Sequence, residues 1–253
     1  MDIMKNYSEE DVWFHKKEKR IYSLIYRPDH VQKAPLIIIC HGFGGSHKVN
    51  LISADIYANA GYAVCTMDFC GGSDKTISDG SVTEMSVLTE KEDLLTVIEQ
   101  AGKLPYIDEK RIYLWGESQG AFVAALTAAE IPDKIRGEIL LYPALNLPDM
   151  GKKQFEKKTD ITESILWDIR LGPVYYQDMW DMNVYGCISG YHGPVLLLHG
   201  DQDEIVPIEY SENAKKVFRN VEYHVISGQG HSFYNEAGRK VDAMILEFLN
   251  KNR

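Results

Sequence analysis

The sequence predicts an α/β fold built on a mostly parallel β-sheet. Short runs rich in Val, Ile and Leu are nearly continuous rather than alternating, which is typical of strands buried on both faces. Amphipathic segments of helical length separate these runs, and this alternation favours right-handed βαβ crossovers with helices on both sheet faces. The runs span residues 36–40, 62–67, 112–115, 138–142, 195–198 and 223–226, and the helical segments 53–60, 88–101, 118–130, 209–218 and 235–250.

The chain begins with a different pattern. Two apolar stretches, residues 12–14 and 21–26, flank a basic run at residues 16–20. This pattern predicts an antiparallel hairpin whose basic run forms a solvated turn. Added to the six later runs, the hairpin makes an eight-stranded sheet.

A long connection interrupts the alternation of strands and helices between about residues 145 and 191. Most connections in compact domains are far shorter, and long ones are usually functional. We therefore expect one domain over residues 1–253, with a lid-like cap inserted after the sixth strand. Tyr175 and Tyr176 are its predicted substrate contacts, although aromatic residues at such spacing are also typical of a packed core. The aromatic residues of the segment are Phe155, Trp167, Tyr175, Tyr176, Trp180 and Tyr185.

Composition limits the class of protein. Hydrophobic residues make up 45% and charged residues 25%, and the net charge is −10. This acidity disfavours nucleic acid and anionic membranes as partners, because binding phosphate needs clustered Lys and Arg. Four cysteines without CxxC or zinc spacing predict free thiols, and residues 1–10 lack the apolar core of a signal peptide. We expect a cytoplasmic monomer or homodimer with no metal or cofactor.

The first candidate catalytic residue is Ser118, in the run Gly-Glu-Ser-Gln-Gly at residues 116–120. An apolar strand precedes this GxSxG pattern and a helix rich in alanine follows it. In that context a tight strand-to-helix turn exposes the serine in a strained conformation, so Ser118 is the predicted nucleophile. The simpler interpretation is a serine that only caps the helix.

A serine hydroxyl needs a base and a carboxylate that orients the base. His231 lies in a Gly-rich loop after the last strand, where the crevice of an open parallel sheet forms. A loop histidine that bonds only nearby backbone remains the alternative. Asp203 follows the strand at residues 195–198, so the order Ser, Asp, His matches that expected for this arrangement. We expect Asp201 to bond backbone in its turn instead, and Glu204 to be exposed.

Acyl transfer also needs N–H donors that face the developing oxyanion. The backbone N–H of Gln119, directly after the predicted nucleophile, is one candidate. The Gly-rich loop at residues 42–45, after the third strand, is expected to supply the other. A generic glycine turn is the alternative, whereas no phosphate-loop pattern is present.

These four segments together (HGFGG, GESQG, HGDQDEIVP and GQGHSF) resemble the α/β-hydrolase superfamily over about residues 21–249. The resemblance implies Ser118 as nucleophile, His231 as base and Asp203 as its orienting acid. It also implies that the N–H groups of Phe43 and Gln119 form the oxyanion hole, and that His41 shapes the oxyanion loop.

More specifically, residues 67–69, residues 85–88 and the aromatic insertion resemble bacterial cinnamoyl or feruloyl esterases and related small carboxylesterases. The loop at residues 68–73 is shorter than the DxxGxGxS form common in that group. The resemblance implies a serine ester hydrolase for small esters with an apolar or aromatic acyl group, including hydroxycinnamates. An acylaminoacyl-peptidase-like or monoacylglycerol lipase activity is the alternative. A non-catalytic binding protein is remote because all three triad positions are filled, and no HExxH pattern supports metal hydrolysis.

Overall fold

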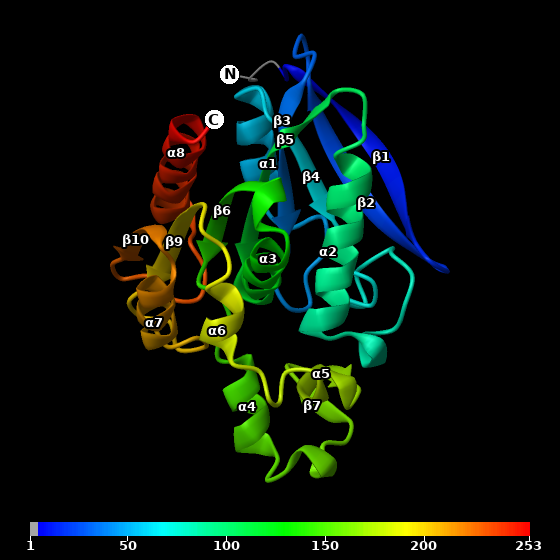
Figure 1. Cartoon of the computed structure of the whole chain (residues 1–253), viewed down its shortest axis with the longest axis vertical. Coiled ribbons are helices and arrows are strands. Elements are labelled where there is room, and N and C mark those ends of the chain that lie inside the picture. Colours follow the sequence, from blue (N-terminus) through cyan, green and yellow to red (C-terminus); the bar gives the residue numbers. More distant parts are fainter. Residues whose placement is uncertain (1–4) are drawn as a thin grey trace.

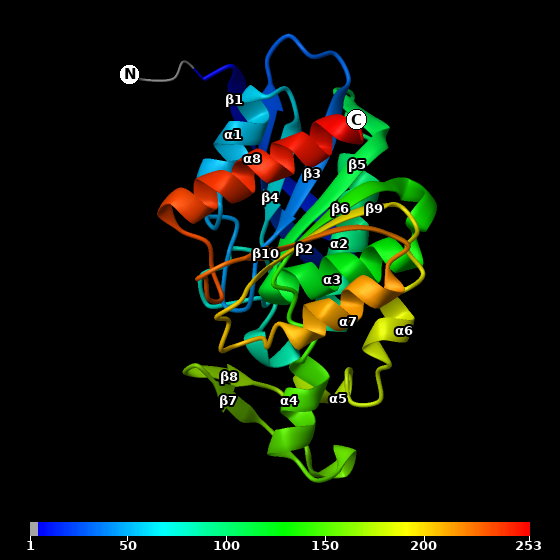
Figure 2. The same ribbon diagram turned by 90° about the vertical axis from the view of Figure 1, so that its left-hand side faces the viewer.

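The central sheet has eight strands with helices on both faces (Figures 1 and 2). The computed structural model describes residues 5–253, so residues 1–4 of the polar N-terminal segment lie outside the described part. The strand order is β1-β2-β4-β3-β5-β6-β9-β10, and only the β1–β2 and β2–β4 pairs are antiparallel. The predicted, mostly parallel sheet is confirmed. Its strands are β1 (Tyr7–Lys16), β2 (Lys19–Pro28), β3 (Ala34–Cys40), β4 (Ala63–Met67), β5 (Ile107–Glu117), β6 (Ile135–Leu141), β9 (Pro194–Gly200) and β10 (Asn220–Ile226).

The helices of the two layers follow the predicted alternation. Outside the segment between β6 and β9 they are α1 (Leu51–Asn59), α2 (Val87–Ala101), α3 (Ser118–Glu130), α7 (Glu209–Val217) and α8 (Asn235–Lys251). Short 3₁₀ turns form at Val82–Glu84 and Pro132–Lys134. Among the described residues no helix is both long and apolar enough to cross a membrane.

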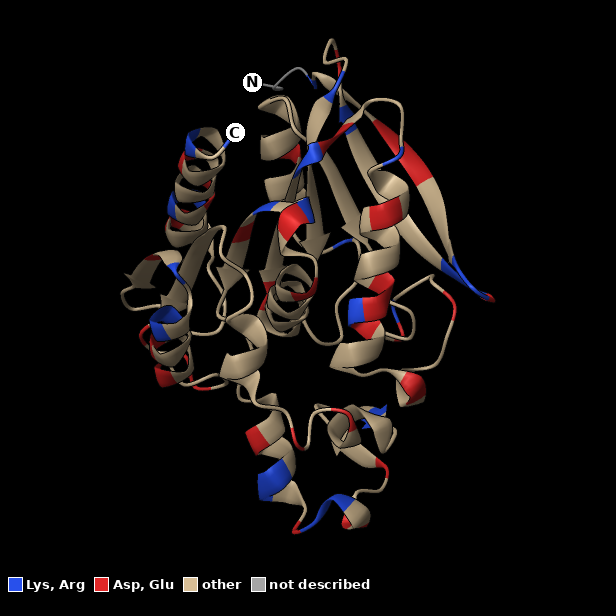
Figure 3. Cartoon of the chain, in the orientation of Figure 1, with Lys and Arg blue, Asp and Glu red and all other residues tan. Residues whose placement is uncertain are grey.

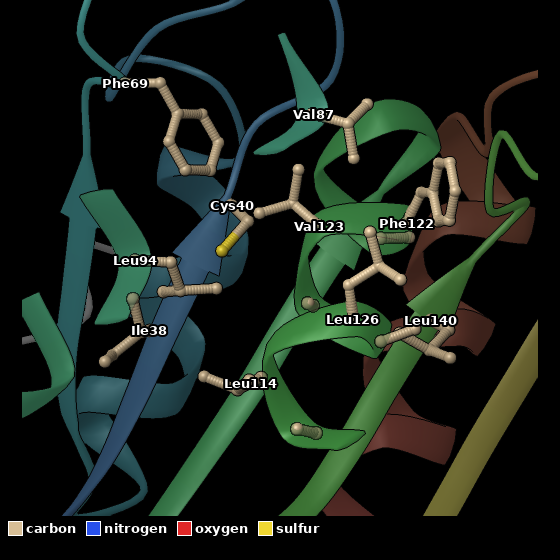
Figure 4. Packing of buried hydrophobic residues seen from close by; sticks show 14 of the residues in the cluster. Ile38, Cys40, Phe69, Val87, Leu94, Leu114, Phe122, Val123, Leu126 and Leu140 are labelled. Carbon is tan, nitrogen blue, oxygen red and sulfur yellow. The ribbon is translucent and has the colours of Figure 1, made fainter. Parts of the chain in front are cut away.

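The strands at the centre of the sheet are buried on both faces, which explains their continuous apolar runs. In β3, Ile38 and Cys40 pack with Val123 of α3 on one face (Figure 4). The intervening residues Ile37 and Ile39 belong to a second apolar cluster, formed with α1 and α8 on the opposite face. Because each central strand has two apolar partners, its sequence shows no alternation of polar and apolar residues.

The N-terminal hairpin also forms as predicted. β1 and β2 pair from Tyr7 with Pro28 to Lys16 with Lys19. Lys and Arg residues gather near its tip (Figure 3), where Lys16 forms an ion pair with the buried Asp93 of α2.

The segment between β6 and β9 extends beyond one end of the sheet (Figures 1 and 2). It contains a small antiparallel sheet separate from the main one, and Tyr175 and Tyr176 are buried within it. Whether this segment behaves as a lid stays a prediction. Its elements are α4 (Leu147–Gln154), a 3₁₀ turn (Lys158–Asp160), β7 (Ser164–Leu166), β8 (Ile169–Leu171), α5 (Val174–Gln177) and α6 (Val184–Ile188).

Glu138 on β6 is an acid inside the apolar core. It is fully buried, and neither carboxyl oxygen has a hydrogen-bond partner among the described residues. Burial raises its pKa well above the ordinary value of 4.5. The folded protein therefore holds a proton on Glu138 that the unfolded chain releases above pH 4.5. The stability tied to this proton is complete below pH 4.5 and is lost as pH rises toward the folded-state pKa.

We expect Glu138→Gln to make the protein more stable than wild type at pH 8 and to change its stability little at pH 4.5. The wild-type penalty grows by about 1.4 kcal/mol per pH unit between the two pKa values. Urea unfolding at several pH values measures the difference. Glu247→Gln, at an exposed position of α8, is the control. An equal effect of Glu138→Gln at both pH values would contradict a neutral buried carboxyl.

Candidate active site

Ser118 lies at the junction where β5 ends and α3 begins. Its φ of 51° is in the left-handed region that non-glycine residues rarely adopt. The junction requires glycine on both sides of the serine. A Cβ on Gly116 would lie 2.5 Å from the carbonyl oxygen of Gly120, and one on Gly120 would lie 2.2 Å from that of Cys40. The predicted strained turn is therefore present, and the flanking glycines let β3 and α3 approach it.

Ser118, His231 and Asp203 form a continuous hydrogen-bonded chain. Nε2 of His231 lies 2.8 Å from Oγ of Ser118, and Nδ1 lies 2.7 Å from Oδ2 of Asp203. An ionised carboxylate only accepts hydrogen bonds, so Nδ1 carries the proton and donates a hydrogen bond to Asp203. The unprotonated Nε2 of the neutral ring then accepts from the Ser118 hydroxyl. This tautomer is the one that a general base next to a serine requires.

The Asp203 carboxylate is held in its ionised form. Burial opposes ionisation, but hydrogen bonds from His199, His231 and the Val206 backbone outweigh it and hold the pKa of Asp203 well below its usual range. Its Oδ1 accepts from the N–H groups of Ile205 and Val206, both at 2.9 Å. This loop therefore holds a charged carboxylate against Nδ1 of His231.

His199, at the end of β9, is a second histidine on the same carboxylate. Its Nε2 lies 3.2 Å from Oδ2 of Asp203 and 2.9 Å from the Val206 carbonyl oxygen. Both groups only accept, so Nε2 carries a proton, while Nδ1 accepts from the Ser211 hydroxyl at 2.7 Å. The buried His199 thus donates to the same carboxylate oxygen as His231 and helps to hold the Asp203 side chain in place.

Asp201 and Glu204 do not take part in this chain. Asp201 accepts from the hydroxyl of Ser227 and the N–H of Gly228, which lie in the loop that carries His231. The expected bond to backbone within its own turn is therefore replaced by bonds to that distant loop. Glu204 is exposed. Of the three acids near the end of β9, the structure brings only Asp203 to a histidine.

The predicted oxyanion donors lie on the two segments that meet at Ser118. Gln119 is the second residue of α3, where a backbone N–H has no acceptor within the helix. The loop after β3 approaches the nucleophile so closely that a Cβ on Gly42 would lie 3.2 Å from Cβ of Ser118. Phe43 follows Gly42, and its N–H has no backbone acceptor within residues 5–253. Both amides are thus free to bind an oxyanion.

His41 packs beneath the glycine-rich loop at residues 42–45 and bonds it to the segment after β4. Burial lowers the pKa of His41, so the ring is neutral. Its Nδ1 lies 2.8 Å from the carbonyl oxygen of Gly42, and its Nε2 accepts from the N–H of Phe69 at 3.3 Å. These contacts agree with the structural role implied for His41.

The Gln119 side chain links the insertion to the residue that follows Ser118. Its Oε1 accepts from the Tyr175 hydroxyl at 2.7 Å, and its Nε2 donates to Oε2 of Glu90 on α2 at 2.8 Å. Burial raises the pKa of Glu90 to about 8. Tyr175 therefore bonds the residue that directly follows Ser118.

A cavity of about 390 Å³ opens over the Ser118 hydroxyl. Neither Tyr175 nor Tyr176 lines it, so the substrate contacts predicted for them are not seen there. Trp167 of the same insertion does line it, and its ring packs at 5.6 Å from that of Phe43. The lining residues are Gly42, Phe43, Glu117, Ser118, Tyr142, Trp167, Ile205, His231 and Ser232.

Sequence reasoning missed Glu90, His199, Tyr142 and Trp167 as site residues. Glu90 has a sequence signal, because it occupies a core-facing position of α2 between Val87 and Leu94. Tyr142 has none. Its ring lies 4.7 Å from that of His231 and its hydroxyl donates to Glu117, both through contacts between distant segments.

Solved structures share the fold over nearly the whole chain. Est1E from Butyrivibrio proteoclasticus, solved with ferulic acid bound, superposes with a TM-score of 0.87 at 28% identity, over 95% of this chain and 98% of that one.

Two curated relatives match this chain over only part of their own length. An uncharacterized 31.7 kDa protein of Escherichia coli is 38% identical over 107 residues, which cover 42% of this chain and 36% of the relative. The acylamino-acid-releasing enzyme of Rattus norvegicus is 25% identical over 241 residues, or 88% of this chain and 31% of that enzyme. The chain thus spans about a third of these relatives.

The sequence profile of the prolyl oligopeptidase family matches residues 48–253, which include the candidate nucleophile, base and acid. The fold and the profile lead to one conclusion: this chain belongs to the prolyl oligopeptidase family and is an α/β-hydrolase that resembles feruloyl esterases.

Proposed function

We propose that this hydrolase is a serine esterase that cleaves carboxylic esters through an acyl-enzyme on Ser118. The observation that carries the proposal is the Ser118–His231–Asp203 chain, with hydrogen bonds of 2.8 and 2.7 Å, at the base of an open cavity. Strained backbone at Ser118 and two free backbone amides beside it add to this support. All these features serve the same step, attack of a serine on an acyl carbon.

The reaction follows from the hydrogen bonds. His231 takes the proton of Ser118 as Oγ attacks the ester carbonyl, and the amides of Phe43 and Gln119 stabilise the oxyanion that develops. Asp203, ionised throughout, stabilises the charged His231 ring. The ring then donates its proton to the leaving alcohol, which departs and leaves the acyl-enzyme. Water, deprotonated by His231, releases the acid and restores Ser118.

The acyl group that this proposal favours is apolar or aromatic, including hydroxycinnamates. Phe43, Trp167 and Ile205 provide three apolar walls of the cavity above Ser118. Trp167 is 54% exposed, so its indole is accessible to a bound ring. The similarity to Est1E, whose structure contains ferulic acid, gives independent support for an aromatic acid.

Cleavage of acylated peptides is the second candidate. It is favoured by the match to the prolyl oligopeptidase family and by the similarity to the acylamino-acid-releasing enzyme over most of the chain. The same serine, base and oxyanion donors would serve an amide, so the contacts to the leaving group decide between the two.

A substrate panel separates the candidates. We expect methyl ferulate and p-nitrophenyl butyrate to be hydrolysed with a higher kcat/KM than N-acetylalanine p-nitroanilide or a monoacylglycerol. We also expect Trp167→Ala to raise KM for methyl ferulate by about tenfold through loss of an aromatic contact. Ile165→Ala, at an exposed neighbouring position of β7 outside the cavity, is the matched control. A preference for the anilide would favour the peptidase, and equal effects of the two variants would remove Trp167 from the acyl site.

A further inference from the structure

A second cavity, of about 620 Å³, is lined by Phe233 and Tyr234, which follow His231 in the loop before α8. Tyr142 lines both cavities, but Ser118 and His231 line only the first. The first turn of α1, the first turn of α8 and the loop before α8 surround the second cavity. Its lining residues are Lys48, Asn50, Leu51, Ile52, Ser53, Trp115, Leu141, Tyr142, Phe233, Tyr234, Asn235, Gly238, Arg239, Val241 and Asp242.

The N-terminal ends of two helices meet at this cavity. α1 and α8 lie side by side (Figure 2) and are joined by a hydrogen bond of 2.8 Å from Ser53 to Asp242. Neither helix has a side-chain cap, and the first turn of α1 contains no acidic residue. Glu236 in the first turn of α8 pairs with Lys240 and does not line the cavity. The first backbone N–H groups of a helix have no acceptor within it, and the helix dipole favours negative charge there. Two such ends at one cavity favour an anion.

The side chains of the cavity leave hydrogen-bond donors unused. Trp115 is 1% exposed, and its Nε1, which has the Tyr57 hydroxyl as a polar neighbour, makes no hydrogen bond of good geometry in the described part of the chain. The buried Nδ2 of Asn50 has no hydrogen-bond partner among the described residues. Lys48 and Arg239 add two positive charges at exposed positions.

Asp242 is the single acid among the lining residues, and two hydroxyl groups donate to one of its oxygens. Its Oδ1 accepts from the Ser53 hydroxyl and, at 2.9 Å, from the Tyr57 hydroxyl. Lys48 and Arg239 outnumber this one acid, so the charge balance of the lining side chains is positive in a chain whose net charge is −10. A ligand that pairs with the unused groups must bring hydrogen-bond acceptors and negative charge.

The rest of the cavity is apolar and reaches the surface. Leu141, Phe233 and Val241 line it, and two large apolar side chains at its edge remain exposed, Ile52 at 78% and Tyr234 at 70%. Exposed apolar groups gathered around a cavity are typical of a binding site. Here they would cover the apolar part of a ligand whose charged head lies at the helix ends.

We propose that this cavity is a second ligand site, separate from Ser118, for a small amphiphile with an oxyanion head and an apolar tail. The helix ends of α1 and α8, with Lys48 and Arg239, bind the head. The apolar lining residues contact the tail. This proposal does not depend on the reaction at Ser118.

Isothermal titration of the full chain with decanoate, decyl phosphate and decanol tests the site. We expect one molecule of decanoate or decyl phosphate to bind per chain, at least tenfold more tightly than decanol, since a charged head gains charge-assisted hydrogen bonds. The tighter of the two anions identifies the head group. Equal binding of decanol, or no saturable binding, would overturn the proposal.

Variants locate the binding. Arg239→Gln should weaken decanoate binding by about tenfold, while Lys216→Gln, at an exposed position of α7 outside the cavity, should not. Asn50→Asp adds a negative charge at a position whose φ of 63° aspartate tolerates, and should abolish binding. Trp167→Ala alters only the cavity over Ser118 and should leave affinity unchanged. Thermal unfolding of each variant excludes misfolding. Binding that is sensitive to Trp167→Ala but not to Arg239→Gln would place the ligand over Ser118 and refute a second site.

Discussion

Ser118→Ala is expected to lower kcat for ester hydrolysis by about 10⁶-fold, the scale seen when a triad serine is removed. The attacking atom is lost, while the cavity and the two oxyanion amides remain. The substitution removes a single oxygen and leaves the flanking glycines, which allow the close backbone contacts of this junction, in place. The fold is therefore expected to survive. Initial rates with p-nitrophenyl butyrate, together with labelling of the wild type by a fluorophosphonate probe, measure the effect.

Ser232→Ala is the matched control for that experiment. Ser232 lines the same cavity, and its hydroxyl donates to the backbone carbonyl of His231 rather than to the imidazole. We expect a change below about tenfold and unaltered labelling. Full activity of Ser118→Ala would remove Ser118 as nucleophile and with it the proposed acyl-enzyme.

Asp203→Asn is expected to lower kcat by about 10⁴-fold with little change in KM. The asparagine amide matches the carboxylate in shape but carries no charge. It offers an N–H group to His231 or His199, both of which donate to the carboxylate in the wild type. His231 is then driven to the tautomer with its proton on Nε2, which cannot accept from Ser118. The charge that stabilises protonated His231 is also lost.

Asp201→Asn, two residues away, tests the choice between the acids of this loop. Asp201 contacts Ser227 and Gly228 but no histidine, so we expect nearly wild-type kcat and a modest loss of stability. Pre-steady-state rates and thermal unfolding of both variants distinguish a catalytic effect from a structural one. A larger loss in Asp201→Asn than in Asp203→Asn would reverse the assignment.

Most of the fold could be read from the sequence because the central strands have apolar neighbours on both faces. Ile37 and Ile38 of β3 point to different layers and are equally buried, so the run stays apolar from end to end. The segment between β6 and β9 is less regular. Its helices are four to eight residues long and its strands three, too short for periodicity to distinguish them.

The candidate site also has a part that the sequence predicted and a part that it did not. Ser118, Asp203 and His231 each lie in a motif at the end of a strand, so their types and order predicted the hydrogen-bonded chain that the structure contains. Tyr175 was expected at the substrate, yet its hydroxyl bonds Gln119 and its ring is buried. An aromatic residue within an irregular insertion has no sequence feature that tells a packed side chain from an exposed one.

The sequence by itself determined the parallel sheet, the strained serine turn and the chain order of Ser118, Asp203 and His231, because each depends on local spacing or on burial within one strand. Only the tertiary structure decided what surrounds them. It placed His199 behind Asp203 and Trp167 over Ser118. It also brought the uncapped ends of α1 and α8 to a second cavity. These contacts join segments that are far apart in the chain. The packing of the layers, and not the spacing of residues along the sequence, determines which side chains meet.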